Sequence, residues 1–124
     1  MMTLTFWGVR GSIPTPGKHT VRYGGNTPSL ELRLDGDRLI ILDAGTGIRN
    51  FGDDLINNGE SVNAYLLISH PHWDHIQGFP FFKPAFIPGN ELTIIGTDRP
   101  EKSLSEIIAE QMNRIYFPVQ LHDL

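Results

Sequence analysis

Residues 64–75 read AYLLISHPHWDH, an apolar run followed at once by a segment rich in histidine. The apolar run predicts a buried strand, and His70–His75 places three imidazoles and one carboxylate directly after it. These are nitrogen and oxygen donors that Zn²⁺, Mn²⁺ and Fe²⁺ accept, and the absence of cysteine excludes a thiolate-rich structural site. A solvated turn is the alternative, but three histidines with an interposed aspartate rarely arise for packing. The stretch therefore predicts a metal site at the end of a strand.

The spacing of these four side chains has a geometric meaning. If His70 and His72 continue the extended chain, both side chains point to the same side and can converge on one ion. Pro71 favours this, because it disfavours the helical region for the residue before it. Asp74 and His75 then follow where the chain turns into a short helix, and they approach the same cleft from another direction. This arrangement favours two adjacent metal positions over one.

The rest of the pattern predicts strands first and then strands mixed with helices. Strands are expected at residues 4–7, 29–34, 38–42, 64–69 and 91–96, and amphipathic helices at 48–57 and 103–113. The residues 35–37, Asp-Gly-Asp, predict a hairpin turn, while Ser103 and Glu106 form a potential capping box. One sheet covered by helices on one face is the simplest architecture. Its other face is then apolar and uncovered, which predicts poor solubility or self-association.

Composition fits one globular unit over residues 1–124, because 40% of the residues are hydrophobic and 19% are charged. The net charge of −4 supplies no basic field for an extended nucleic acid, although metals can still attract phosphate locally. Without cysteine there is no disulfide framework. The first twenty residues show neither a signal peptide nor a membrane span, so a cytoplasmic location is the expectation.

The pattern His-x-His-x-Asp-His after an apolar strand resembles the signature of the metallo-β-lactamase-fold hydrolases. Residues 43–47 (DAGTG), after an earlier strand, accompany this signature. Within that superfamily, three further segments look like a bacterial phosphodiesterase-like branch near the ribonuclease Z and cyclic-nucleotide phosphodiesterase groups. These segments are residues 6–16, residues 23–27 (YGGNT) and residues 75–82 (HIQGFPFF). Trp73 stands where ribonuclease Z enzymes commonly have glycine.

The resemblance implies an α+β fold, the αββα sandwich, of which this chain is expected to form the N-terminal half, with a mixed sheet covered by helices on one face. It also implies two divalent metal ions, zinc first and manganese or iron otherwise. His70 and His72 would bind the first ion, and Asp74 and His75 the second, with Asp74 also counted as catalytic. The family's remaining ligands, two histidines and a bridging aspartate, come from later in its chains. His122 is expected to be a surface residue rather than one of them.

Two readings of Asp43 remain open. It could orient a ligand histidine through the second ring nitrogen, or it could be a turn aspartate that bonds nearby backbone amides. Among Phe79, Phe81 and Phe82, packing in the core is expected for at least two, and the third could border a substrate pocket.

Three hypotheses for function follow. The leading one is a metal-dependent phosphodiesterase that acts on a small or nucleotide phosphodiester. The second is a hydrolase of thioesters or lactams, since a metal-activated hydroxide would also attack a carbonyl. The third is a catalytically inert chain that binds metal or a partner chain that completes the fold.

Overall fold

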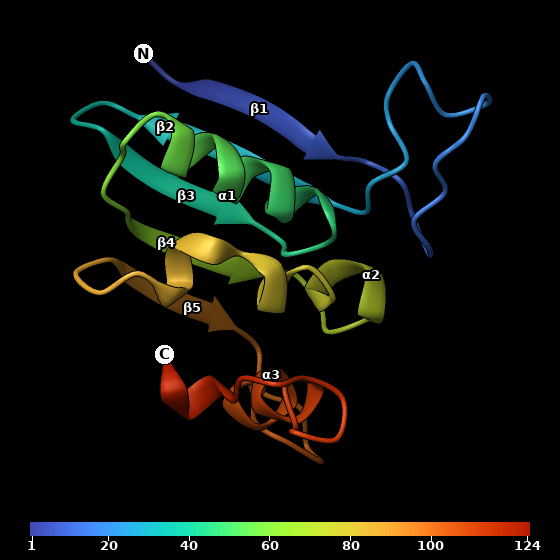
Figure 1. The fold of residues 1–124 in the computed structure, drawn as a ribbon, viewed down its shortest axis with the longest axis vertical. Helices are drawn as coiled ribbons and strands as arrows, with labels where there is room; N and C mark the ends of the chain where they lie inside the picture. Colours follow the sequence, from blue (N-terminus) through green and yellow to red (C-terminus); the bar gives the residue numbers. More distant parts are fainter.

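The computed structural model describes all residues 1–124, and it shows one five-stranded sheet in the order β1-β2-β3-β4-β5 (Figure 1). The strands are β1 Thr3–Gly8, β2 Ser29–Leu34, β3 Arg38–Leu42, β4 Asn63–Ile68 and β5 Glu91–Gly96. The α-helices are α1 Gly47–Asn57, α2 Trp73–Ile76 and α3 Leu104–Gln111, and the 3-10 helices are η1 Phe79–Phe81, η2 Lys83–Phe86 and η3 Leu121–Asp123. The chain is thus α+β, as the sequence predicts.

The sheet is mixed. β1, β2 and β3 pair antiparallel, whereas β3, β4 and β5 pair parallel. The β2–β3 hairpin forms where the sequence predicts it, because Gly36 (φ 76°) and Asp37 (φ 57°) adopt the left-handed conformation that a tight hairpin turn requires. The crossover between β3 and β4 contains α1, and the one between β4 and β5 contains α2, η1 and η2.

α1 and the segment that contains η1 and η2 lie over one face of the sheet, whereas α2 lies beyond the ends of the strands and α3 beyond β5 (Figure 1). The apolar residues of α1 lie on one side, so that Ile48, Phe51 and Leu55 are fully buried against the sheet. Facing them are the alternate residues of β3 and β4, whose side chains point to the helical side. The core on this side includes Leu39, Ile41, Ala64, Leu66 and Ile68.

The opposite face of the sheet is apolar and has no cover. The strand register aligns two rows of residues across this face, one running Leu4, Leu32, Ile40, Tyr65, Thr93 and the other Phe6, Leu30, Leu42, Leu67, Ile95. Phe6 is 62% exposed, and Tyr65 is 52% exposed. The one-sided helical cover expected from the sequence is therefore what the structure shows. We call these two rows the outer face below.

Element ends differ slightly from the predicted ones. β4 begins and ends one residue earlier, and α3 is shorter at both ends than residues 103–113. Ser103 caps α3 through a hydrogen bond from the Glu106 backbone N–H to its Oγ, which is the first half of the expected capping box. No helix has both the length and the apolar character needed to cross a membrane.

The parallel part of the sheet decides where the polar residues meet. Because β3, β4 and β5 run in the same direction, their carboxyl ends lie at one edge of the sheet. The segments that leave this edge are residues 43–46 after β3, residues 69–75 after β4 and residues 97–100 after β5. The candidate metal ligands and Asp43 are therefore on neighbouring loops.

Candidate metal centre

The three imidazoles of the motif lie together. The ring centroid of His70 is 4.5 Å from that of His72 and 4.1 Å from that of His75. His72 has extended backbone angles and is the N-cap residue of α2, which then brings His75 back towards His70. The sequence prediction of an extended segment followed by a short helix is confirmed.

Asp74 and His75 present neighbouring donor atoms. The distance between Asp74 Oδ2 and His75 Nε2 is 3.4 Å. Two ligands held at about 2.1 Å from a tetrahedral ion are separated by about 3.4 Å, so this spacing matches that of two ligands on one zinc ion. This geometry supports the pairing of Asp74 with His75 at one metal position.

A full coordination shell is not formed by these residues as they stand. No group of three or more His, Asp or Glu side chains is arranged so that it could hold one ion. The motif supplies donors of the right chemistry, and the structure gathers them, but the assignment of His70, His72, Asp74 and His75 as ligands stays a prediction.

Asp43 connects Ser69, the residue before the motif, with His75, the last residue of the motif. Its Oδ2 lies 2.9 Å from His75 Nδ1, and its Oδ1 accepts a hydrogen bond of 2.8 Å from the Ser69 backbone N–H. The residue has φ 63°, in the left-handed region that non-glycine residues rarely occupy. Asp43 therefore combines both readings left open by the sequence: it bonds a backbone amide, and it fixes the ring nitrogen of His75 that faces away from Asp74.

Ser69 is a contact that sequence reasoning missed. Its Oγ lies 2.8 Å from Asp43 Oδ2 and 3.1 Å from His70 Nδ1, so it links the Asp43 carboxylate to a second histidine. Its position between the strand and the motif is the only local signal of this role. The contact depends on the pairing of β3 with β4, which a single strand does not reveal.

The carboxylate of Asp74 is buried, and a backbone N–H satisfies it. Ser12, in the loop after β1, donates its N–H to Asp74 Oδ2 at 2.9 Å, and Ser12 also has a left-handed backbone (φ 72°). Burial alone raises the pKa of Asp74, but the Ser12 hydrogen bond, the charge of His75 and lesser contributions outweigh it, so that the pKa lies below its ordinary value. The carboxylate is therefore ionised near neutral pH, as a metal ligand must be.

Glycines let the two strand-end loops touch. A Cβ on Gly45 would lie 2.4 Å from the Asp74 carbonyl oxygen, and one on Gly78 would lie 2.0 Å from the Gly45 carbonyl oxygen. Two hydrogen bonds accompany this contact, from Ala44 N to the His75 carbonyl and from Gly78 N to the Ala44 carbonyl. The close contact of the two loops therefore explains the glycines of this turn, without a role in phosphate binding.

The remaining predicted residues lie as follows. Phe79 and Phe82 are buried in the core, whereas Phe81 is 54% exposed and packs edge-on against Phe117. The side chain of His122 is 74% exposed beside Asp123, in η3, as expected for a surface residue.

Nearly the whole chain is similar, at low sequence identity, to two curated proteins. No family model matches. Ribonuclease Z of Methanococcus maripaludis is 30% identical over 99% of this chain, and ribonuclease Z of Staphylococcus carnosus is 25% identical over 95% of it. This chain spans about 38% of the length of these curated relatives. This similarity points to the same superfamily as the motif does, and it supports no narrower family.

Proposed function

We propose that this chain carries part of a dinuclear metal site of the metallo-β-lactamase type, and that the complete site hydrolyses phosphodiesters. The observation that supports the proposal best is the pairing of Asp74 with His75 while Asp43 holds the far nitrogen of that histidine. A carboxylate that fixes a histidine ring in this way is the usual support of a metal-binding imidazole.

Each residue has a distinct task in the proposed site. His70 and His72 would hold one ion, and Asp74 and His75 the other. The chemistry that bound divalent ions supply is the activation of a water for attack and the neutralisation of charge on phosphoryl oxygens. Asp43 keeps the proton of His75 on Nδ1, leaving Nε2 free to bind, and the Ser12 N–H keeps Asp74 ionised. Zinc suits this donor set first, and manganese or iron otherwise.

Phosphodiesters are preferred to carbonyl substrates because both relatives are named ribonucleases, enzymes of phosphodiester cleavage. A thioester or lactam remains the alternative for the same kind of site. A second candidate function is favoured by the absence of three converging donors. In that case the chain is catalytically inert unless a partner chain supplies further ligands.

The first test is metal content. The protein, purified without chelator or affinity tag, is analysed by inductively coupled plasma mass spectrometry beside His72→Ala and a control, His19→Ala. His19 is an exposed loop histidine outside the motif. We expect metal near stoichiometric in the parent and in the His19 variant, and a clear loss in the His72 variant with unchanged circular dichroism. Full occupancy in the His72 variant would show that the ligand assignment is wrong.

Activity separates the hypotheses. Metal-loaded protein is assayed with bis(p-nitrophenyl) phosphate and with thioester and lactam reporters, beside Asp74→Asn. Hydrolysis of the phosphodiester that Asp74→Asn abolishes would support the proposal. Turnover of the carbonyl substrates alone would contradict it, and metal binding without any turnover would favour the inert alternative.

A further inference from the structure

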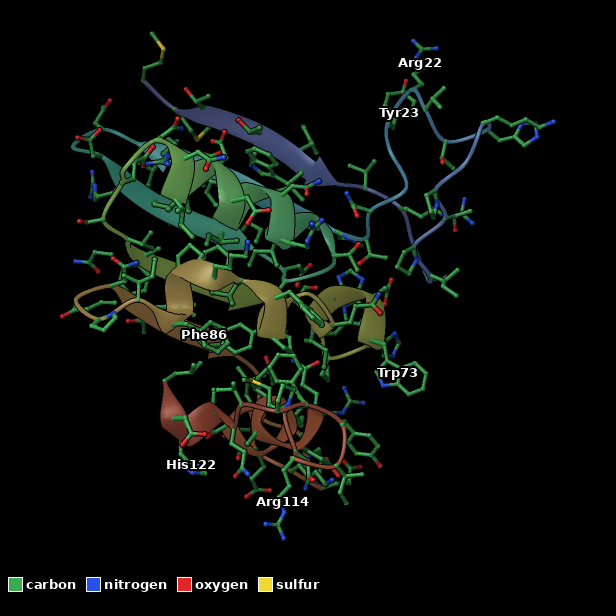
Figure 2. The ribbon with its side chains drawn as sticks, in the orientation of Figure 1. Arg22, Tyr23, Trp73, Phe86, Arg114 and His122 are labelled. Carbon is green, nitrogen blue, oxygen red and sulfur yellow. The ribbon has the colours of Figure 1, made fainter.

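Trp73 has no role in packing. It lies between two predicted ligands, His72 and Asp74, yet it is 83% exposed and its indole N–H makes no hydrogen bond within the protein. Its ring projects away from the body of the molecule (Figure 2). Trp7 shows the contrasting case, because its ring stacks on Phe51 at 5.2 Å and its indole N–H donates to Glu31. The exposed indole beside the candidate site is therefore free to contact a ligand through its ring face and its N–H.

Trp73 borders an open hollow with a volume of about 540 Å³. Pro71 and Ile76 form the wall on the side of the motif, and Ile107 and Tyr116 contribute from α3 and the segment after it. Tyr116 is itself 76% exposed. The hollow therefore offers two aromatic rings, from segments about 40 residues apart in sequence, to the same volume. Pro71 and Trp73 alternate in sequence with the predicted ligands, so the hollow lies beside the motif, while none of the four predicted ligands lines it.

The hollow contains both hydrogen-bond donors and acceptors, among them the Trp73 indole N–H and the Tyr116 hydroxyl. Gln111 donates its Nε2 to the Ile76 carbonyl at 3.0 Å, which fixes the side chain and leaves its amide oxygen available. Glu110 also lines the hollow, and its carboxylate pairs with Lys102 on the surface. Aromatic faces combined with donors and acceptors at the edge complement a planar ring that both donates and accepts hydrogen bonds, as adenine does.

We propose that the Trp73–Tyr116 hollow binds a nucleobase, and that the base of a nucleotide phosphodiester stacks on Trp73 while its phosphate reaches the proposed metal site. The inference rests on the proposed function for the position of the phosphate, but the binding of the base needs only the hollow. Base stacking on an aromatic side chain is worth about 1 to 3 kcal/mol, which corresponds to about 5- to 150-fold in affinity.

The binding test uses metal-free protein with adenosine, adenosine 5′-monophosphate and ribose 5-phosphate as probes. We expect adenosine and the monophosphate to quench the fluorescence of Trp73 in a saturable way, and ribose 5-phosphate to leave it unchanged. Trp7 is the other tryptophan of the chain, so the signal of Trp73→Phe gives the background. Ligand-observed NMR then compares affinities among variants without relying on fluorescence.

The variants are Trp73→Ala, Trp73→Phe and Tyr116→Ala, with Tyr23→Ala as the matched control. Tyr23 is 73% exposed on a different loop, where it contacts Arg22 (Figure 2). We expect adenosine affinity to fall about 5- to 150-fold in Trp73→Ala and to recover in Trp73→Phe, because a phenyl ring still stacks. Tyr116→Ala should weaken binding, and Tyr23→Ala should not.

Unchanged adenosine binding in Trp73→Ala, or ribose 5-phosphate that binds as well as the monophosphate, would overturn the inference. Failure here is distinguishable from failure of the proposed function. If the protein binds metal and cleaves bis(p-nitrophenyl) phosphate but does not bind adenosine, only the base subsite is ruled out. If the protein binds adenosine through Trp73 but binds no metal, the base subsite is supported and the proposed hydrolase centre is ruled out.

Discussion

Asp43 contacts Ser69, just before the histidine motif, and His75, its last residue, and its two carboxylate oxygens have different hydrogen-bond partners. Oδ1 accepts from the Ser69 N–H, which can only donate, while Oδ2 faces His75 Nδ1. In Asp43→Asn the amide oxygen must therefore face Ser69, which turns the amide NH₂ towards His75. His75 then accepts at Nδ1 and carries its proton on Nε2, the nitrogen proposed to bind metal. We expect metal affinity to fall about 10- to 100-fold, measured by zinc titration against a chromophoric chelator.

The matched control for this change is Asp37→Asn. Asp37 also has a left-handed backbone (φ 57°), but it lies in the β2–β3 turn. Asparagine tolerates this conformation about as well as aspartate does, so neither variant should lose much stability through the backbone. Equal zinc affinity in the two variants would mean that Asp43 serves only the turn.

At the scale of elements, the motif depends on contact between the loop after β3 and the loop after β4. Gly45→Ala places a methyl group 2.4 Å from the Asp74 carbonyl oxygen, which is backbone and cannot rotate away. We expect a loss of about 1 to 3 kcal/mol in unfolding free energy, together with weaker zinc binding, because α2 must shift. Urea unfolding and the same zinc titration measure the two effects.

Gly17→Ala is the comparison for Gly45→Ala, since a Cβ at residue 17 meets nothing within 4 Å. It removes the same backbone freedom from the unfolded chain without introducing a contact. If Gly45→Ala unfolded at the same urea concentration as Gly17→Ala, the close approach of the two loops would be absent in solution.

Local pattern accounts for most elements. Alternation in residues 29–34, the Asp-Gly-Asp turn and the apolar spacing of α1 each follow from period and turn chemistry, and all three form as predicted. The contacts of Asp43 with Ser69 and His75 do not follow, because they require β3 and β4 to be parallel neighbours. The Ser12 bond to Asp74 spans 62 residues, and no local signal marks it. The sequence therefore predicts the donors, and the fold adds the contacts of Asp43 and Ser12 that the sequence does not predict.

The whole molecule has two unlike faces. The helical side of the sheet is packed, whereas the outer face presents two aligned apolar rows to solvent. Contiguous apolar surface of this kind favours association, because burial removes it from water. Among the large hydrophobic side chains of the outer face, Phe6 on β1 and Tyr65 on β4 are the most exposed, at 62% and 52%. They contribute little to the core, so replacing them changes the surface more than the fold.

We therefore expect the protein to self-associate as its concentration rises, and the double variant Phe6→Lys, Tyr65→Lys to remain monomeric. Two lysines would have to be desolvated in any sheet-to-sheet contact, and their like charges would repel across it. The control is Ile13→Lys, Val21→Lys, which adds the same charge at two exposed apolar positions of the loop after β1. Sedimentation velocity over a range of concentrations should show association for the parent and the loop variant alike. A parent that stays monomeric throughout would mean that the outer face alone does not drive self-association, and loss of association in the loop variant as well would trace the effect to net charge rather than to the sheet face.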